Sequence, residues 1–507
     1  MQASDRLLDI VSEGEVTMNQ EITDLRSAID FLKTIPGQYM ETDVEADPIC
    51  EVHGVYRYIG AGGTVPPPTR EGPAVGFNHL KNYPGMRMVI GMLASRSRVA
   101  WMLGEKPERL AFRLREAVMN AIPPVIVGPE KAKCQEVVYR VEDDGFDVRK
   151  ILPNTQSTPA DAGSCITAGL CMASDPETGR TDVTIHRMFV LDKPDEISFN
   201  YSSTRHIGIM HKKAEAMGKA LPISVSIGLD PAVYVGTCFE PPTTPYGFNE
   251  LDIAGALRGK PVELAPCLTI SEHAIANAEF VIEGELLPGV RVDEGCMTGT
   301  GVSIPEFPGY DGTTHEVAVL KVKAVTHRKN PIFQTLIGAS EEHVNLAGPA
   351  MEAGIIEMAE KAMPGVLLNA YAHPSGGGKF LAVLQIRKTK PTDEGRQRQA
   401  ALLAFAAFGE LKHVIVVDED VDLFSSHDVL WAMTTRYQGD IDTLCIPGVR
   451  YHRNDPSATA EYSPSTRADG AACKTIFDCT VPYELKEKFQ RPKFMELDPG
   501  KFFPDLL

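Results

Sequence analysis

The chain has 507 residues, a formal net charge of −18, 43% hydrophobic residues and 23% charged residues. This length exceeds one ordinary hydrophobic core and predicts two to four domains in a globular protein. The acidic balance argues against nucleic acid or an anionic membrane as a partner, although a local site can still bind a small anion. No apolar run reaches the roughly 18 residues that a membrane span needs.

Ten cysteines are scattered along the chain without a CxxC pair. This pattern matches neither a zinc ribbon nor a disulfide framework, so we expect reduced thiols in a cytoplasmic protein. Residues 1–15 are acidic and lack the basic and apolar parts of a signal peptide, so we expect none.

In chain order, residues 21–37 predict an amphipathic helix that Pro36 and Gly37 end. Residues 59–77 contain several glycines and three successive prolines and predict a loop. Between about 135 and 330, short alternating runs predict a mostly antiparallel sheet or barrel, with one helix at 248–259. These runs lie at 182–190, 222–229, 279–287 and 316–325.

After about residue 345, helical and strand patterns alternate. Residues 392–412 and 425–438 predict helices, the second with a serine cap, and 413–424 begins as a buried strand. This order indicates α/β organisation. We therefore expect a multidomain α+β protein with an N-terminal α/β region (1–134), a central β-rich domain (135–335) and a C-terminal α/β domain (336–507).

One strand of the central region carries an unusual arginine. Arg187 is in phase with Val183, Ile185 and Phe189, whereas Asp182, Thr184 and His186 alternate to the other face. A guanidinium is costly to bury without a partner. Arg187 therefore meets an anion, which could be a structural carboxylate of the same chain or a ligand.

Three further residues could bind a metal. Asp182, His206 and Glu250 together form a set of ligands suited to Mg²⁺ or Mn²⁺ rather than to a structural zinc. Because they lie far apart in the chain, spacing alone does not distinguish this site from three unrelated polar residues.

Glu306 lies in the sequence Pro305-Glu306-Phe307-Pro308. The prolines stiffen the backbone and the apolar neighbours desolvate the carboxyl group, as a general acid requires. The alternative is a solvated turn glutamate. The "SGGGKF" stretch at 375–380 lacks the spacing of a phosphate-binding P-loop, and no dinucleotide fingerprint occurs.

Several stretches together resemble the UbiD-type family of reversible decarboxylases, which use prenylated FMN. The resemblance extends from about Leu25 to Pro482. Its most specific parts are "GPAVGFN", "TDVTIHRM", "STRHIG", "FNELDIAGAL", "IPEFPGY", "THRKNPIFQTLIG", "VDEDVDLFSSHDVLWAMTTR" and "CKTIFDCTVP". The stretches "YRYIGAGGTV", "EEH" and "GGGKF" are similar to the hydroxybenzoate group, the protocatechuate and gallate decarboxylases.

The resemblance implies a central split β-barrel domain that binds prenylated FMN and a C-terminal domain that forms a pocket wall and an oligomer contact. It implies Arg187 and Glu306 as the catalytic residues, with Arg187 at the flavin facing the substrate carboxylate and Glu306 as the proton donor. Asp182, His206 and Glu250 match the family's ligands for Mn²⁺ or Mg²⁺, with K⁺ often nearby, although other branches have Asn at the position of Asp182. The implied cofactor-binding residues are Asp182, Val183, Thr184, Ile185, His186, Arg187, Arg205, His206, Glu250 and Lys474.

The resemblance also implies residues for the substrate end of the pocket and for the proton relay. His343, Lys379 and His452 match positions that bind substrate, where a phenolic hydroxyl would suit them. Many members have a second glutamate at the position where this chain has Gly301. Because of this departure, the residue that acts as proton-relay partner is left open. Asp293 and Glu294 lie a full loop upstream and need not replace it.

The expected function is reversible non-oxidative decarboxylation of 3,4-dihydroxybenzoate to catechol, or of gallate to pyrogallol. The alternatives are decarboxylation of another acid, such as 4-hydroxybenzoate or vanillate, and an ordinary FMN-binding reductase. The expected partners are a small aromatic acid, CO₂ or bicarbonate, a flavin prenyltransferase that supplies the cofactor, and further copies of the chain in a homo-oligomer.

Overall fold

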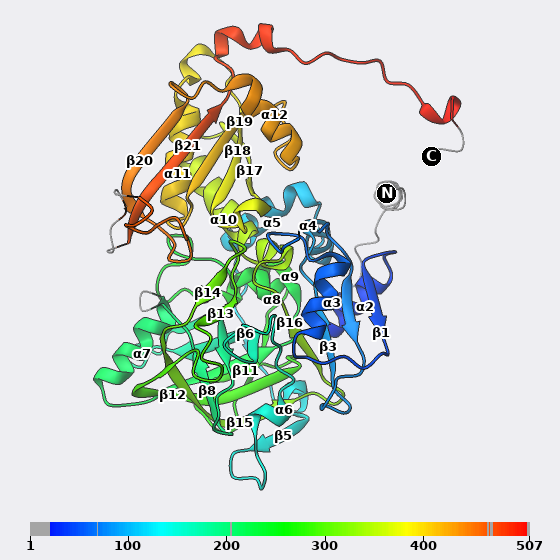
Figure 1. Ribbon diagram of the computed structural model, residues 1–507, viewed down its shortest axis with the longest axis vertical. Helices are drawn as coiled ribbons and strands as arrows, with labels where there is room; N and C mark the ends of the chain where they lie inside the picture. The colour runs from blue at the N-terminus through cyan, green and yellow to red at the C-terminus, as the bar shows by residue number, and fades with distance from the viewer. Residues whose placement is uncertain (1–20, 68, 203–204, 464–465, 467–469, 504–507) are drawn as a thin grey trace.

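The computed structural model describes residues 21–503, apart from 68, 203–204, 464–465 and 467–469. The expected absence of a signal peptide concerns residues outside this part of the chain. Figure 1 shows a β-rich central body, with the N-terminal elements beside it and the C-terminal sheet stacked above. Among the described helices, none is both long enough and apolar enough to cross a membrane.

The N-terminal region is built on a small sheet in the order β1-β2-β3-β16. The predicted first helix is α2, which begins after Asp24, whose side chain accepts a hydrogen bond from Ser27 N. The helix ends at Lys33, before the two predicted terminators, and buries one apolar face. The elements are α2 Leu25–Lys33, β1 Tyr39–Thr42, α3 Glu51–Gly60, β2 Ala74–Phe77, β3 Arg87–Ile90, α4 Arg96–Met102 and α5 Leu110–Met119.

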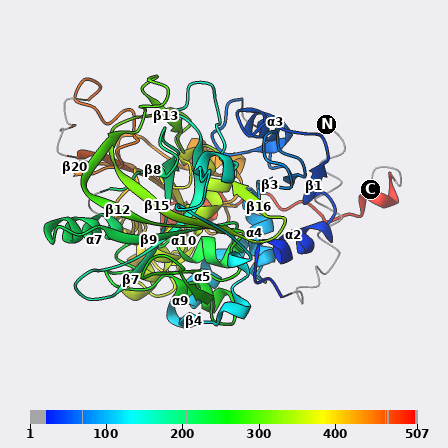
Figure 2. The ribbon, with the colours of Figure 1, turned by 90° about the horizontal axis from the view of Figure 1, so that it is seen from below.

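The central region contains the predicted antiparallel sheet, with strands in the order β5-β15-β12-β9-β6-β7, and β8 also paired with β15. All of its ladders are antiparallel. The four alternating runs are β7, β9, β12 and β15, and Figure 2 shows β12 and β15 running side by side across this body. The strands are β4 Val125–Ile126, β5 Val137–Arg140, β6 Cys165–Ser174, β7 Thr181–Phe189, β8 Glu196–Phe199, β9 Leu221–Ile227, β10 Glu263–Pro266, β11 His273–Ile275, β12 Phe280–Asp293, β13 Val302–Pro305, β14 Asp311–Thr313, β15 Glu316–His327 and β16 Ile332–Thr335.

The central region has more helices than the single one expected. Besides α9 (Leu251–Arg258), it contains α6 (Val148–Ile151), α7 (His206–Ala216) and α8 (Pro231–Gly236). No side chain caps α7. The helices α6 and α8 are too short for apolar periodicity to show. The sequence pattern therefore predicts fewer helices than the structure contains. Two strand pairs join residues on opposite sides of the expected domain limits. β4 lies before residue 134 and pairs with β10, and β16 lies before residue 335 but pairs with β3 of the N-terminal region. The limits at 134 and 335 therefore stay predictions.

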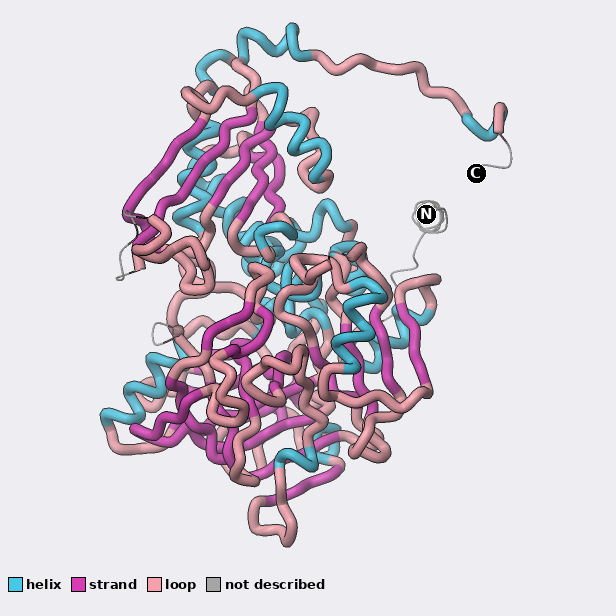
Figure 3. The backbone as a smooth tube through the Cα atoms, viewed as in Figure 1, coloured by secondary structure: helices cyan, strands magenta, loops and turns pink. Residues whose placement is uncertain are grey.

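The C-terminal region is a five-stranded sheet in the order β17-β18-β19-β21-β20, covered on both faces, and Figure 3 shows its strands and helices by colour. Alternate strand residues pack against α10 and α11 on one face and against α12 on the other, as the near-continuous apolar run of β19 requires. The predicted serine cap of α12 is Ser425. The elements are α10 Glu341–Ala362, β17 Leu367–Ala372, β18 Leu381–Ile386, α11 Arg396–Ala407, β19 His413–Asp418, α12 Ser426–Arg436, β20 Thr443–Arg450 and β21 Ala471–Cys479.

Candidate active site

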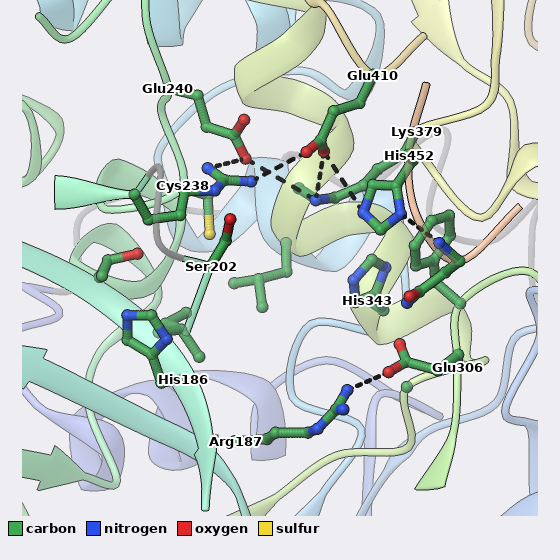
Figure 4. A pocket seen from close by; sticks show the side chains of 18 of the residues that line it. His186, Arg187, Ser202, Cys238, Glu240, Glu306, His343, Lys379, Glu410 and His452 are labelled. Atoms are coloured by element: carbon green, nitrogen blue, oxygen red, sulfur yellow. Dashed lines mark hydrogen bonds and ion pairs between the residues drawn. The ribbon is translucent and has the colours of Figure 1, made fainter. Parts of the chain in front are cut away.

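A cavity of about 400 Å³ lies between the central sheet and the C-terminal region. Its walls come from β7, the segment after β8, the turn between β13 and β14, the start of α10 and the segment that follows β20. Figure 4 shows Arg187 and Glu306 at one end of this pocket and Glu240, Glu410, Lys379 and His452 at the other, with His343 between them. The size suits a small ligand together with part of a cofactor.

Two glutamates share the guanidinium of Arg187. Nε of Arg187 donates to Glu294 Oε1 over 3.0 Å and Nη2 donates to Glu294 Oε2 over 3.3 Å, while Nη1 contacts Glu306 Oε1. Burial acts to lower the pKa of Arg187, but the charges of Glu306 and Glu294 outweigh it and raise this pKa. Burial alone would raise the pKa of Glu294, and Arg187 and Asn200 reverse this and lower it. Arg187 and Glu294 therefore hold each other in their charged forms.

The second carboxylate beside Arg187 is Glu294, which the sequence did not require to replace Gly301. Glu294 follows the last residue of β12, and its N–H donates to the carbonyl of His315, so the end of the sheet carries its side chain to Arg187. Gly301 is exposed and has φ +76°, a conformation that a glutamate would adopt only with strain. The second carboxylate therefore occupies a different position in the chain.

Glu306 is placed by a short hairpin turn between β13 and β14. Its N–H donates to the carbonyl of Tyr310 over 2.9 Å, and its carbonyl accepts from Gly309. The side chain is only 14% exposed, which excludes the solvated turn glutamate. Phe307, the next residue, is buried and stacks on His343 with ring centroids 5.3 Å apart, so the same turn forms part of both ends of the pocket.

Of the three predicted substrate-binding residues, Lys379 and His452 lie at the other end, and His343 lies between the two ends (Figure 4). His343 Nδ1 lies 3.2 Å from the carbonyl of Gly377, Lys379 Nζ lies 3.4 Å from Glu410 Oε2, and His452 Nε2 lies 3.5 Å from the same oxygen. Burial lowers the pKa of His343 to about 3 and that of His452 to about 3. Both imidazoles are consequently neutral near pH 7 and can either donate or accept a hydrogen bond.

Two carboxylates at this end escaped the sequence analysis. Glu410 also lies 3.4 Å from Arg205 Nη2, and Glu240 lies 2.6 Å from Arg205 Nη1 and 3.8 Å from Lys379 Nζ. Burial would raise the pKa of Glu410, but Lys379 and its other cationic neighbours lower it to about 2. Burial would likewise lower the pKa of Lys379, and Glu410 and Glu240 raise it. Neither glutamate belongs to a motif, so only the fold identifies them.

The predicted metal ligands meet at one point. Asp182, His206 and Glu250 each offer a ligand atom within 4.8 Å of the others, and His206 Nδ1 lies 2.8 Å from Asp182 Oδ1. Asp182 Oδ2 and Glu250 Oε2 are buried and have no hydrogen-bond partner among the described residues. Burial and the charge of Asp182 raise the pKa of Glu250 to about 9. Two orphaned oxygens beside an imidazole fit a divalent cation.

The remaining predicted cofactor residues are divided between the pocket and its surroundings. Thr184, Ile185, His186 and Arg205 line the cavity beside Arg187, whereas Val183 is buried in the core. In a regular strand, consecutive residues point to opposite faces. However, β7 is an edge strand, and its ladder with β6 has a bulge opposite Arg187. Residues 184–187 therefore all reach the cavity. Lys474 does not line it, and donates to the carbonyl of Gly409 over 2.7 Å.

Comparisons with known proteins agree with this architecture. Models of the 3-octaprenyl-4-hydroxybenzoate carboxy-lyase family match the N-terminal domain at residues 32–118, the Rift-related domain at 125–341 and the C-terminal domain at 344–479. A gallate decarboxylase from Lactiplantibacillus plantarum is 48% identical over 95% of this chain and 98% of its own length.

Solved structures extend the likeness to the whole fold. A 3,4-dihydroxybenzoic acid decarboxylase from Enterobacter cloacae is 55% identical, with a TM-score of 0.92 over 96% of this chain and 100% of that chain. A UbiD-class enzyme from Pelotomaculum thermopropionicum, solved in complex with FMN, is 32% identical, with a TM-score of 0.82 over 94% of this chain and 98% of that chain.

The fold and the site define a multidomain α+β enzyme with an arginine–glutamate cluster and a metal-type ligand set around one pocket. The chain belongs to the UbiD family of carboxy-lyases.

Proposed function

We propose that this protein catalyses the reversible non-oxidative decarboxylation of a hydroxylated benzoic acid with prenylated FMN, converting 3,4-dihydroxybenzoate to catechol or gallate to pyrogallol. The observation that carries the proposal is the division of one pocket into two ends. A glutamate–arginine pair, Glu306 with Arg187, lies at one end, Lys379 and His452 lie at the other, and His343 lies between them. The identities to a gallate decarboxylase and a 3,4-dihydroxybenzoic acid decarboxylase support this substrate class.

The cofactor would be bound by residues around β7. Asp182 and Glu250, whose buried oxygens lack partners, would hold Mn²⁺ or Mg²⁺ together with His206, and K⁺ would be a second cation of the site. Thr184, Ile185, His186, Arg205 and, from outside the cavity, Lys474 would complete this binding site. Prenylated FMN would supply the electron sink for the charge that CO₂ loss leaves on a ring carbon.

The residues at the glutamate–arginine end would then control the proton. Glu306 would deliver a proton to the ring carbon that has lost its carboxyl group, and would regain it for the next turnover. Arg187 would orient Glu306 and balance its charge after the proton has left, and Glu294 would keep Arg187 in position. In the direction of carboxylation the same groups would act in reverse order.

The residues at the other end would select the substrate. Neutral His343 and His452 can accept or donate a hydrogen bond to a phenolic hydroxyl, and charged Lys379 would stabilise a phenolate oxygen. An unsubstituted ring would place an apolar edge against these buried polar groups and offer them no further hydrogen bond, which is unfavourable. We therefore expect a hydroxyl para to the carboxyl group.

The test is CO₂ release by protein produced together with a flavin prenyltransferase. The assay panel contains 3,4-dihydroxybenzoate, gallate, 4-hydroxybenzoate, vanillate, benzoate and cinnamate. We expect turnover of the di- and trihydroxy acids, slow or no turnover of benzoate and cinnamate, and no activity in protein that holds only FMN. Full activity with ordinary FMN, or rapid turnover of cinnamate alone, would contradict the proposal.

The protein would act as a homo-oligomer in the cytoplasm. Beyond Phe489 the chain extends away from the body, and it exposes large apolar side chains there (Figure 1). These are Phe494, Met495, Leu497, Phe502 and Phe503, each at least 60% exposed, which supports burial against another copy. All ten cysteines are free, which supports a reducing compartment.

A further inference from the structure

A second cavity adjoins the turn that carries Glu306. It has a volume of about 300 Å³ and is lined by α3, by residues 157–158 and by the turn between β13 and β14. The exposed side chains of Tyr310 and Asp311 belong to this lining, so the cavity opens to solvent. No residue lines both this cavity and the first one.

One layer of chain separates the two cavities. Its residues alternate between them: 304, 306, 336 and 338 face the first cavity, and 305, 337 and 339 face the second. Because this wall is a single residue thick, a few polar side chains are enough to cross it.

Four side chains form a hydrogen-bonded path between the cavities. Ser157 lines the second cavity, and its hydroxyl lies 2.7 Å from His53 Nδ1. His53 Nε2 lies 3.1 Å from Thr335 Oγ1, which in turn lies 2.9 Å from Thr167 Oγ1. Thr167 lines the first cavity, whereas His53 and Thr335 are buried. The path therefore runs from one cavity to the other without a gap.

The hydrogens of this path can all point toward the first cavity. When His53 carries its proton on Nε2, Thr335 accepts from His53 and donates to Thr167. Thr167 also accepts from the N–H of Leu336 over 3.0 Å, and its own hydroxyl hydrogen is then left for the cavity. Burial lowers the pKa of His53 to about 3, so its ring is neutral near pH 7 and can pass a proton by accepting at one nitrogen and releasing at the other.

The path reaches the first cavity beside Arg187. Thr167 lies within the bulge of the β6–β7 ladder, between the pairs 166–188 and 169–186, which leaves it opposite Arg187. Arg187 in turn contacts Glu306. The inner end of the path is therefore at the glutamate–arginine end of the pocket.

We propose that Ser157, His53, Thr335 and Thr167 form the route by which Glu306 regains its proton. The inference rests on the proposed function and adds the source of the proton. Replacing the carboxyl group by hydrogen consumes one proton in each turnover, so the donor must be recharged while substrate and cofactor occupy the first cavity. Ser157 takes the proton from water in the second cavity, each member of the path accepts one proton and releases another, and water in the first cavity passes it from Thr167 to Glu306. Carboxylation sends the proton out by the same route.

The test asks whether a small base can replace His53. The kcat and KM for CO₂ release from 3,4-dihydroxybenzoate are measured on cofactor-loaded protein. We expect His53→Ala to lower kcat by about tenfold or more, with KM changed less than about twofold, because proton supply rather than binding is impaired. Imidazole should restore most of this loss. N-methylimidazole fills the same space but can carry a proton on only one nitrogen, so it should not restore activity.

A second pair of variants separates the hydroxyl of Thr335 from its packing. Thr335→Val keeps the shape and removes the hydroxyl, so its kcat should fall about as far as that of His53→Ala. Thr335→Ser keeps the hydroxyl and should stay within about threefold of wild type. The control is His327→Ala, because His327 is also buried but lines neither cavity. Its kcat should change less than about twofold and should not respond to imidazole.

The outcomes distinguish the path from a structural network. Wild-type kcat in His53→Ala, absence of rescue by imidazole, or equal rescue by both bases would overturn the path and leave the proposed function standing. An equal loss in Thr335→Val and Thr335→Ser would do the same. A wild-type protein that releases no CO₂ from any acid of the panel would overturn the proposed function and the path with it.

Discussion

Glu294 Oε1 lies 3.0 Å from Nε of Arg187, although the two residues are 107 positions apart in the chain. Glu294 is completely buried, and it occupies one side of the guanidinium while Glu306 occupies the other. A carboxylate pair of this kind divides one positive charge between a fixed partner and a partner that exchanges a proton.

Removing Glu294 should slow the reaction. In Glu294→Ala, Arg187 keeps only Glu306 as an ionic partner and loses the buried carboxylate that fixes its guanidinium. We expect kcat for decarboxylation to fall by about tenfold or more, because Arg187 no longer holds Glu306 in a fixed geometry. The measurement is the rate of CO₂ release by cofactor-loaded protein. The control is Asp293→Asn, which alters the exposed neighbour of Glu294; a wild-type rate in Glu294→Ala would contradict the expectation.

Glu306→Gln should abolish the proton donor while keeping its shape. We expect decarboxylation to fall by roughly two or more orders of magnitude, the usual contribution of general acid catalysis. Binding of the flavin should survive, because Glu306 is not one of the candidate metal ligands. Initial rates of CO₂ release and the flavin absorbance of the purified protein check both statements, with the exposed Glu316→Gln as the control. Turnover close to wild type would mean that another group donates the proton.

Glu250→Ala should remove the metal and the cofactor together. The variant deletes one of three candidate ligands, and the metal is expected to join the cofactor phosphate to the protein. We expect manganese content and flavin content to fall in parallel when the purified protein is analysed by elemental analysis and absorbance. Asp252→Asn on the same helix is the control, since Asp252 is not part of the ligand set. Stoichiometric manganese and flavin in Glu250→Ala would refute the metal assignment.

Glu410 should contribute to stability in a pH-dependent way. Its folded-state pKa of about 2 lies below the value of about 4.3 expected for an unfolded glutamate, so ionised Glu410 stabilises the folded state. This contribution is fully present above the unfolded pKa and is lost as the pH falls toward the folded pKa.

We therefore expect Glu410→Gln to lower the free energy of unfolding near pH 6, and the difference from wild type to shrink between pH 5 and pH 3. Urea unfolding of cofactor-free protein across this range provides the measurement. Glu487→Gln, an exposed glutamate, should be neutral throughout. A difference between Glu410→Gln and wild type that stays constant down to pH 3 would be inconsistent with the depressed pKa.

Much of the fold could be predicted from local patterns. The alternating runs identified β7, β9, β12 and β15, and cap residues identified α2 and α12, because backbone periodicity and capping act over a few neighbouring residues. The sequence did not predict α7, which lacks a side-chain cap, or α8, which is capped by Asp230 but is too short for apolar periodicity to show. The stretches that resemble the family correctly indicated membership and the class of reaction.

The site residues also differ in how far the sequence reveals them. Arg187 and Glu306 stand out in the sequence because a strand arginine and a glutamate between prolines are locally unusual. Glu294 and Glu410 carry no such mark, and their significance arises from the chain segments that meet at the pocket. The sequence by itself therefore determined the family, the strand pattern and the residues of unusual local chemistry. Only the tertiary structure decided which charges are already paired and which remain free for a ligand, because Coulomb interactions depend on distance in space rather than on separation along the chain.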